Sequence, residues 1–411
     1  MARSGWVKPE GTERLTDHVS LGVLAKVFPP TVVDAAIERT GAAEQRSRLL
    51  PSRVMVYYVM SMALFASASY EEVMRCLLSG MQWLSGRFGT WNMPTKAAIF
   101  KARTRLGSAV MIELFDQVAQ PVANAGGPGF LSGLRLVSVD GTTLDLADTP
   151  ANEAAYGRPG TSTGNKSAFP QARVLGLVEC GTHAVIGAVT SGCSTSENDL
   201  LPGLYHRLDS TMLLIADRGF YGYQAWMDAS ATGAQLLWRI KASQVLPVAQ
   251  ELPDGSYLSH LYASTKDRRN NNAPVQVRVI EYQVSSGQKS TDFRLLTTIL
   301  DPQVAGAQAL AEAYAQRWEV ELCFDELKTH QRGPGLVLRS KTPDGVLQEI
   351  YGFLCTHYAL RSLIGQVAHE FEQDPLRFSF TRTLRAARRS VAGVPDFSPS
   401  PSGGRIHGVL P

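Results

Sequence analysis

The chain has 411 residues, of which 44% are hydrophobic and 19% are charged, and its formal net charge is +3. One hydrophobic core rarely holds a chain of this length, so we expect two or three domains of ordinary globular composition. The low net charge excludes a strongly basic field over the whole molecule, so a polyanionic partner would have to be bound by local patches of Lys and Arg.

The first residues are polar and contain no apolar signal segment, which makes a cytoplasmic location the expectation. The five cysteines form no Cys-x-x-Cys pair and no matching His spacing, so neither a disulfide framework nor a structural zinc site is supported. Residues 54–70 carry no charge, but they are too few for a comfortable membrane span and include Tyr and Ser. A buried core helix is therefore preferred over a membrane helix, and no membrane partner is expected.

The N-terminal part of the chain, residues 15–125, shows the patterns of several helices. One of them, within 93–121, begins with a cluster of basic residues and ends apolar. Such a cluster is either a solvated helical face or a DNA contact, and the sequence leaves both interpretations open. The cluster consists of Lys96, Lys101, Arg103 and Arg105.

The pattern changes after the glycine-rich residues 124–129, which are typical of a linker. Runs rich in Val, Leu and Ile with Gly-containing turns predict strands, and two long helical segments follow. This order predicts an α/β core that carries a β-rich insertion, and the Pro-, Ser- and Gly-rich residues 391–411 are typical of a disordered tail. The strand-like runs lie at 134–146, 172–192, 210–222 and within 223–300, and the helical segments lie at 311–330 and 341–371.

Two apolar strands each end in an aspartate followed closely by glycine, at Asp140 and Asp217. In open α/β sheets the crevice at the carboxyl ends of the strands is where ligands bind. The alternative is that Asp and Gly are present only because they form turns well. A third carboxylate nearby would favour the functional interpretation.

That third carboxylate is Glu321, in the helical segment 311–330. At about 100° per residue, it falls on one narrow stripe with three other polar residues. Because several glutamates gather on a separate, water-facing side, we expect the stripe to be buried against a polar partner or a ligand. The stripe consists of Tyr314, Arg317, Glu321 and Lys328, its apolar borders include Trp318, Leu322 and Phe324, and the water-facing glutamates are Glu312, Glu319 and Glu326.

Three carboxylates that meet in one crevice repel one another unless cations hold them, and hard oxygen ligands suit Mg²⁺ or Mn²⁺. Two such ions can activate an attacking oxygen and stabilise the leaving oxygen in phosphoryl transfer. The Arg and Lys of the stripe would then bind phosphates of a long polyanion. The residues therefore predict metal-dependent cutting of nucleic acid.

The spacing Tyr-x2-Arg-x3-Glu-x6-Lys, met by the four residues of the stripe, occurs together with "SVDGT" and "ADRGFYG". In these motifs the chain resembles the D-D-E transposases of bacterial insertion sequences, specifically the group known as "IS-four". The resemblance covers most of the chain, because residues 15–125 resemble the N-terminal domain of that group and residues 338–354 resemble the segment after its catalytic helix.

The resemblance implies a ribonuclease-H-like catalytic core, interrupted by a β-rich insertion and preceded by an all-α N-terminal domain. It makes Asp140, Asp217 and Glu321 the catalytic ligands of two Mg²⁺ ions, for which Mn²⁺ can substitute. It makes Tyr314, Arg317 and Lys328 contacts to phosphates at the transposon end. The implied segments are a helical, DNA-end-binding domain at 1–126, the two parts of the core at 130–222 and 306–372, the insertion at 223–305, and a basic helix with the tail at 373–411.

The implied reaction is cut-and-paste transposition. Metal-activated water frees a 3′-OH at the element's end, this hydroxyl closes a hairpin on the opposite strand, water reopens the hairpin, and the 3′-OH attacks target DNA. The implied partners are double-stranded DNA, both terminal inverted repeats and target, and a second copy of the chain in a synaptic homodimer.

Some relatives in this group stack a flipped base on an aromatic residue of the insertion. Phe293 and Trp238 are the candidates for that role here, although either can simply be a core residue. Arg239 and Lys241 are further candidates for DNA contacts. The basic segment 381–390 either binds DNA or is a solvated helix end, and the sequence does not decide between these interpretations.

Two alternative functions remain open on the sequence. One is a metal-dependent nuclease of the same fold that cuts DNA without joining it. The other is an inactive copy that only binds DNA, against which the intact set of three carboxylates argues.

Overall fold

The computed structural model describes residues 22–45, 48, 50–85, 93–160, 166–286 and 289–389. The predicted disordered tail, 391–411, lies outside the described residues. The chain divides into two units. One contains the residues up to Val118, Glu326–Ala368 and the residues from Arg377 on, and the other contains Ala119–Asp325 and His369–Leu376.

In the described residues of the first unit, the regular elements are helices. Its helices are α1 (Gly22–Val27), α2 (Pro30–Arg39), α3 (Ser52–Leu64), α4 (Tyr70–Ser85), α5 (Lys96–Leu106), α6 (Ala109–Val118), the π-helix η3 (Glu326–Gln331), α13 (Pro343–Glu370), whose last two residues belong to the second unit, and α14 (Phe380–Arg389). The predicted helical N-terminal region is therefore confirmed. The predicted helix at 341–371 is confirmed as α13.

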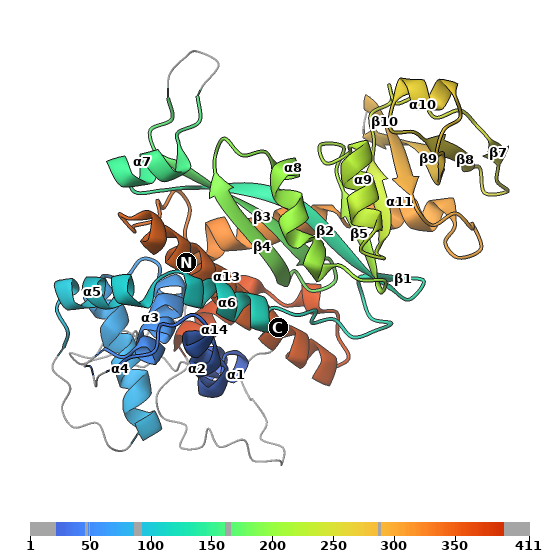
Figure 1. Ribbon diagram of the computed structural model, residues 1–411. Coiled ribbons are helices and arrows are strands. Elements are labelled where there is room, and N and C mark those ends of the chain that lie inside the picture. Colours follow the sequence, from blue (N-terminus) through green and yellow to red (C-terminus); the bar gives the residue numbers. More distant parts are fainter. Residues whose placement is uncertain are drawn as a thin grey trace. The chain divides into compact units, whose positions relative to one another are not determined.

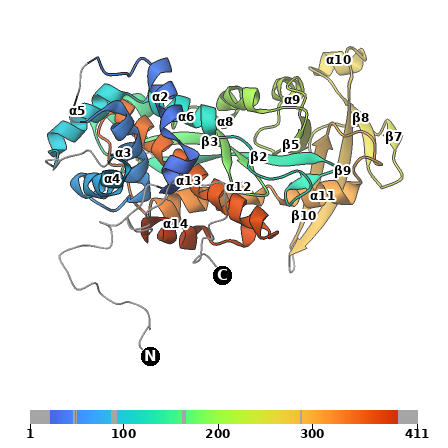
Figure 2. The same ribbon diagram turned by 90° about the horizontal axis from the view of Figure 1, so that it is seen from below.

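The apolar segment 54–70 contributes the buried helix α3, which ends at Leu64, to the core of this unit. In α3 every residue except Arg53 is buried, and Figures 1 and 2 both show α3 beside α13. The two helices approach closely at Gly352, where an added Cβ would lie 2.9 Å from the side chain and the carbonyl oxygen of Val59. The Thr356 hydroxyl donates to the carbonyl oxygen of Met60 at 3.0 Å. The core-helix interpretation is confirmed, and among the described helices none is long and apolar enough to cross a membrane.

The basic segment 93–121 forms two helices, α5 and α6, and not one. Thr95 caps α5 by accepting a hydrogen bond from the amide of Ala98. The helix ends at Gly107, whose φ of +72° lies in the left-handed region that glycine adopts without strain. The following helix, α6, buries Val110, Met111, Leu114 and Phe115.

The second unit is built on a ten-stranded sheet of order β4-β3-β2-β5-β6-β10-β9-β8-β7, with β1 paired to β2. Within it β2, β5 and β6 are parallel neighbours, and the other pairs are antiparallel. The predicted α/β class is therefore confirmed. The strands are β1 (Phe130–Leu131), β2 (Leu134–Asp145), β3 (Gln171–Glu179), β4 (Val185–Gly192), β5 (Met212–Ala216), β6 (Gln235–Arg239), β7 (Gln250–Glu251), β8 (Tyr257–Leu261), β9 (Val275–Ser286) and β10 (Lys289–Thr297).

Helices lie on both faces of this sheet. Figure 2 shows α8 and α9 on one face and α11 and α12 on the other. Within the predicted insertion, 223–305, β6 joins the parallel strands, and β7 to β10 extend the same sheet beyond it. The helical elements are α7 (Pro150–Tyr156), α8 (Glu197–Leu200), η2 (Leu201–Arg207), α9 (Tyr223–Ser230), α10 (Thr265–Arg269), α11 (Ala307–Ala315), α12 (Trp318–Asp325) and the short η4 (Pro375–Arg377), whose last residue belongs to the first unit.

The predicted helix at 311–330 is not one continuous helix, and that prediction was wrong. Tight i to i+3 hydrogen bonds replace the α-helical ladder between α11 and α12: the amide of Arg317 donates to Tyr314 at 3.0 Å, and that of Val320 donates to Arg317 at 3.2 Å. After Asp325 the chain continues as the π-helix η3. A projection at 100° per residue therefore does not hold over the whole segment. The sequence does not reveal either interruption, because the residues around them are good helix formers.

Candidate active site

Asp140 and Asp217 lie side by side on adjacent parallel strands. The register pairs Val139 of β2 with Ala216 of β5. The residue that follows each of them, Asp140 or Asp217, is therefore at the same level of the sheet. Asp217 follows the end of β5, as predicted. Asp140 does not, because β2 continues to Asp145 and Asp140 lies within the strand.

Two polar residues contact these carboxylates: Arg317 links Asp140 to Glu321 of α12, and Tyr314 contacts Asp217. The Arg317 guanidinium lies 3.8 Å from Oδ2 of Asp140 and donates to Oε1 of Glu321 at 2.9 Å. The Tyr314 hydroxyl donates to Oδ1 of Asp217 at 3.2 Å. The structure therefore brings together five of the predicted site residues, the three carboxylates with Arg317 and Tyr314.

A close approach of helix and strand fixes where α12 lies. Phe324, buried on α12, packs onto Gly176 of β3, where an added Cβ would lie 3.0 Å from Cζ of the ring. Gly176 is the residue that pairs with Asp140 across the antiparallel β2 and β3. The absence of a side chain at Gly176 thus sets the distance between the strand that carries Asp140 and the helix that carries Glu321.

The environment of Asp140 raises its pKa to about 6. Burial is the main cause, and the neighbouring carboxylates of Glu197 and Glu321 add to it by repulsion, while a hydrogen bond from the amide of Gly141 and the charge of Arg317 oppose it. Burial also raises the pKa of the Tyr314 hydroxyl, and the charge of Asp217 adds to this. Tyr314 is therefore a donor near neutral pH, as its contact with Asp217 requires.

Glu197 is a fourth carboxylate at this site, and the sequence reasoning missed it. Its carboxylate lies against Gly141, where a side chain would overlap it. Ser196 and Asp199 form a capping box that starts α8 and places Glu197 in its first turn. The sequence spacing of Ser196 and Asp199 signals a helix start, but nothing in the sequence places that helix beside Asp140.

The predicted polar stripe has different surroundings from those expected. Trp318 and Leu322 are 60% and 54% exposed, so they do not bury the stripe. Two of the supposedly water-facing glutamates are engaged in the protein: Glu319 contacts the buried His183 within the second unit, and Glu326 is buried within the first unit. Lys328 is half-buried in η3 and belongs to the first unit.

The aromatic candidates have different positions. Trp238 is 0% exposed and packs edge-on against Trp226 with ring centroids 5.5 Å apart, so it is a core residue and offers no face to a base. Phe293 is half-buried. The ring of Tyr282 stacks on it with the ring centroids 5.2 Å apart, and the Arg239 guanidinium lies 4.0 Å from the centroid of the Phe293 ring. Phe293 also meets Tyr314 edge-on at 6.1 Å. Lys241, just after β6, is exposed.

The basic residues of α5 are not equivalent. Arg103 is only 6% exposed, and its guanidinium donates to Gln348, Ser340 and the carbonyl oxygen of Gly345, so the prediction of a DNA contact there was wrong. Lys101 and Arg105 are exposed, although Arg105 also donates to the carbonyl oxygen of Leu50 at 2.7 Å.

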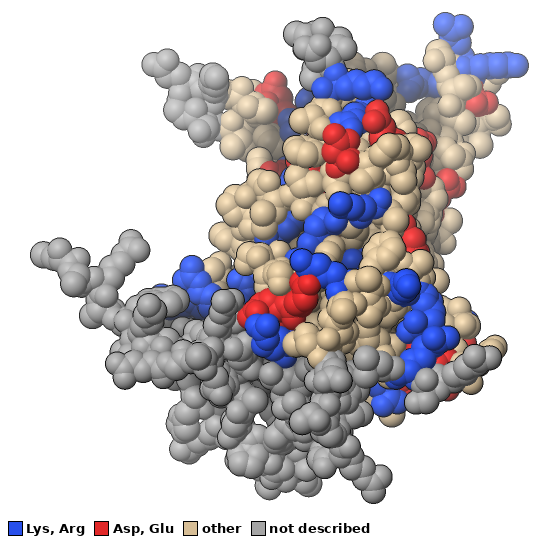
Figure 3. Space-filling model, turned by 90° about the vertical axis from the view of Figure 1, so that its left-hand side faces the viewer, with Lys and Arg blue, Asp and Glu red and all other residues tan. Residues whose placement is uncertain are grey.

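The basic helix α14 has an exposed and a structural side. Arg382 and Arg385 are exposed, while Arg388 donates to the carbonyl oxygens of Leu64 and Gln331. On the face of the molecule in Figure 3, Lys and Arg side chains form several groups separated by neutral and acidic residues.

Comparison with known families identifies the class. Residues 131–358, which are 228 of the 411 residues, match the family model described as a transposase DDE domain. The domain spans Asp140, Asp217 and Glu321. The match to this domain identifies the chain as a DDE transposase, an enzyme class of DNA transposition, and the domain implies a general dependence on divalent metal ions.

Residues 18–116 match a second family model, described as the N-terminal region of the insertion element 4 transposase. The chain belongs to the IS4 family of DDE transposases. It is 26% identical over 385 residues to the transposase InsG for insertion sequence element IS4 of Escherichia coli (strain K12), a match that covers 92% of this chain and 84% of InsG. A cryo-EM structure of a piggyBac transposase synaptic complex with hairpin DNA matches with a TM-score of 0.45 and 10% identity, over 93% of this chain and 82% of that chain.

The donor atoms of the site fit a divalent ion in kind, because carboxylate oxygens are the hard ligands that Mg²⁺ and Mn²⁺ prefer. Within the described part of the chain, no group of three or more His, Cys, Asp and Glu residues is close enough to hold one ion. The carboxylates instead meet Arg317 and Tyr314. Binding of one ion by all three carboxylates would therefore require the side chains of this site to rearrange.

Proposed function

We propose that this transposase carries out cut-and-paste transposition, with cleavage at the ends of its insertion sequence and transfer of the freed 3′-OH into target DNA. The observation that supports this most is the assembly of Asp140, Asp217 and Glu321 around Arg317 and Tyr314 within a transposase DDE domain. The strand order β4-β3-β2-β5-β6, with three parallel strands, supports a ribonuclease-H-like core followed by an insertion that extends its sheet.

In this proposal Asp140, Asp217 and Glu321 hold two Mg²⁺ ions, and Mn²⁺ can substitute. When bound, the ions activate the attacking oxygen and stabilise the leaving oxygen of phosphoryl transfer. Asp140 must lose its proton to become a ligand. Because its pKa is raised to about 6, part of the protein still carries this proton near pH 6 and must release it when the ion binds. Glu197 adds negative charge beside Asp140 and so favours a bound cation there.

Arg317 and Tyr314 each have two uses in the proposal. Without DNA they contact the carboxylates, and with DNA they bind phosphates at the transposon end, since both are strong donors to anionic oxygen. Their transfer from carboxylate to phosphate would free the carboxylates for the ions. Lys328, Lys101, Arg105, Arg239 and Lys241 are proposed as further DNA contacts, and Phe293 as the aromatic residue beside a flipped base.

The finer course of the reaction is also a proposal. We infer a hairpin on the transposon end, specific recognition of the terminal inverted repeats, a homodimer that pairs two ends, and action in the bacterial cytoplasm on nucleoid DNA. These features are supported by membership in the IS4 family.

The test is an assay of purified protein with labelled end DNA and Mg²⁺. We expect nicked, hairpin and strand-transfer products, and their loss in Asp217→Ala. Cleavage without any joined product would favour the nuclease alternative. Binding of end DNA without cleavage by the unmodified chain would favour an inactive copy, and an unchanged cleavage rate in Asp217→Ala would refute the assignment of Asp217.

A further inference from the structure

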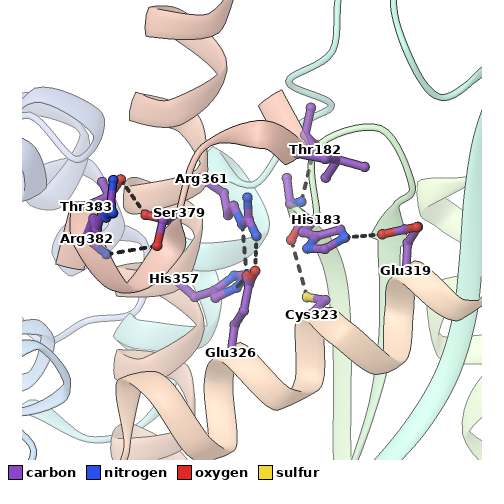
Figure 4. A network of polar contacts seen from close by, with 12 residues as sticks. Thr182, His183, Glu319, Cys323, Glu326, His357, Arg361, Ser379, Arg382 and Thr383 are labelled. Atoms are coloured by element: carbon purple, nitrogen blue, oxygen red, sulfur yellow. Dashed lines mark hydrogen bonds and ion pairs between the residues drawn. The ribbon is translucent and has the colours of Figure 1, made fainter. Parts of the chain in front are cut away.

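Glu321 lies on α12 between two residues that contact the same partner. That partner is His183, in the turn between β3 and β4. Nε2 of the buried His183 lies 2.6 Å from Oε2 of Glu319, two residues before Glu321. Sγ of Cys323, two residues after Glu321, donates to the carbonyl oxygen of His183 at 3.3 Å. Figure 4 shows both contacts reaching His183 from successive turns of the helix.

The backbone of His183 is in a conformation that a side chain disfavours. Its φ is +57°, in the left-handed region where glycine is the usual residue and a non-glycine residue is strained. Gly181 is nearby in the same turn, so a flexible residue is present but does not occupy this position. The turn thus carries an imidazole at a strained position, and the ring makes the contact with Glu319.

The turn itself is held firmly. The Thr182 hydroxyl donates a hydrogen bond to the carboxylate of Glu179. The same carboxylate accepts hydrogen bonds from the amides of Val122 and Ala123 and forms an ion pair with Arg135 of β2. The turn is therefore tied to β2, the strand that carries Asp140. A connection runs from β2 through Glu179 and the turn to His183, and from there to both sides of Glu321.

We propose that His183 is a positioning residue, which sets the axial position of α12 so that Glu321 faces Asp140. The inference rests on the proposed catalytic role of Glu321. The ring holds the helical turn before Glu321, and the carbonyl oxygen holds the turn after it. Two contacts that flank one residue fix its height along the helix axis better than either contact alone.

The principal test is His183→Gly, because glycine relieves the left-handed backbone and keeps the carbonyl oxygen that Cys323 contacts. A merely structural role would change the melting temperature and leave cleavage by the folded enzyme unchanged. The positioning role predicts end-DNA binding within about twofold of the unmodified enzyme, cleavage reduced about 10- to 100-fold, and a higher Mn²⁺ concentration for half-maximal binding, measured by electron paramagnetic resonance.

Glu319→Gln removes the charge of the partner at nearly constant shape and provides a second route if His183→Gly does not fold. The double variant should be no slower than the slower single variant, because both changes break one contact. Glu281→Gln is the matched control: it alters an ion pair with Arg294 elsewhere in the same unit and should leave cleavage and Mn²⁺ binding unchanged.

Glu321→Gln, measured in parallel, separates the two claims. If the unmodified enzyme cleaves and Glu321→Gln does not, the role of Glu321 stands. If His183→Gly and Glu319→Gln both fold, and both cleave DNA and bind Mn²⁺ as the unmodified enzyme does, the positioning role alone would be overturned. If Glu321→Gln cleaves normally, the proposed catalytic role fails first.

Discussion

Gly176→Ala should impair cleavage far more than its effect on stability suggests. The added Cβ would lie 3.0 Å from Cζ and 3.2 Å from Cε1 of Phe324. Carbon atoms in contact prefer about 3.5–4.0 Å, so the ring, and with it α12, must move away by about 0.5–1 Å. Overpacking of this kind costs about 1–3 kcal/mol of unfolding free energy. A displacement of about 1 Å at a reacting group costs about 100-fold in rate, and Phe324 is three residues from Glu321.

The assay compares end-cleavage rates and chemical denaturation curves of Gly176→Ala and Gly187→Ala. Gly187 on β4 is a matched control, because its added Cβ would lie 3.2 Å from Cγ of Arg207 and from Cδ2 of Leu204. Both variants should lose similar stability, and only Gly176→Ala should lose most of its cleavage. Equal cleavage in the two variants would refute the view that Gly176 sets the position of Glu321.

Three further predictions concern charge and burial. In metal-free protein, the raised pKa of Asp140 means that the folded state binds a proton at this carboxyl group more tightly than the unfolded state does. Proton binding therefore stabilises the fold fully below about pH 4, and this contribution to the unfolding free energy is lost as the pH rises through about 6. The unfolding free energy relative to Asp140→Asn should therefore fall between those pH values, and a constant difference would contradict the burial of Asp140. Arg103→Ala should lower the unfolding free energy by about 2–4 kcal/mol, because it leaves buried partners without their donor, whereas Lys101→Ala should change it by less than about 0.5 kcal/mol and weaken DNA binding; similar denaturation midpoints for the two would contradict the burial of Arg103. Glu326→Gln should cost about 3–5 kcal/mol in thermal or chemical unfolding, because it removes the carboxylate that pairs with the buried Arg361, and an unchanged midpoint would refute this role.

The sequence predicted the parts of the fold whose pattern is local. The uncharged segment 54–70 predicted a core helix, found as α3, and the apolar runs before Asp140 and Asp217 predicted strands, which the structure shows as the parallel neighbours β2 and β5. The break between α11 and α12 could not be predicted, because residues on both sides of it are good helix formers. Hydrogen bonding at Arg317, and not composition, divides the segment.

The candidate site was predictable to the extent that its residues repeat a motif spacing. The contacts of Arg103 and Glu326 were not predictable, because their partners lie far along the chain and charge alone suggests exposure. Glu197 and His183 were missed for the same reason. Each reaches the site through a turn or a short helix whose position depends on the tertiary fold.

Glu321→Gln, assayed with labelled transposon-end DNA and Mg²⁺, tests the central claim most directly. The variant keeps the shape of the side chain and removes the charge that a metal ion requires. The proposed mechanism predicts end-DNA binding close to that of the unmodified enzyme, measured by gel shift, together with loss of both cleavage and strand-transfer products. Cleavage at the unmodified rate by Glu321→Gln would contradict it.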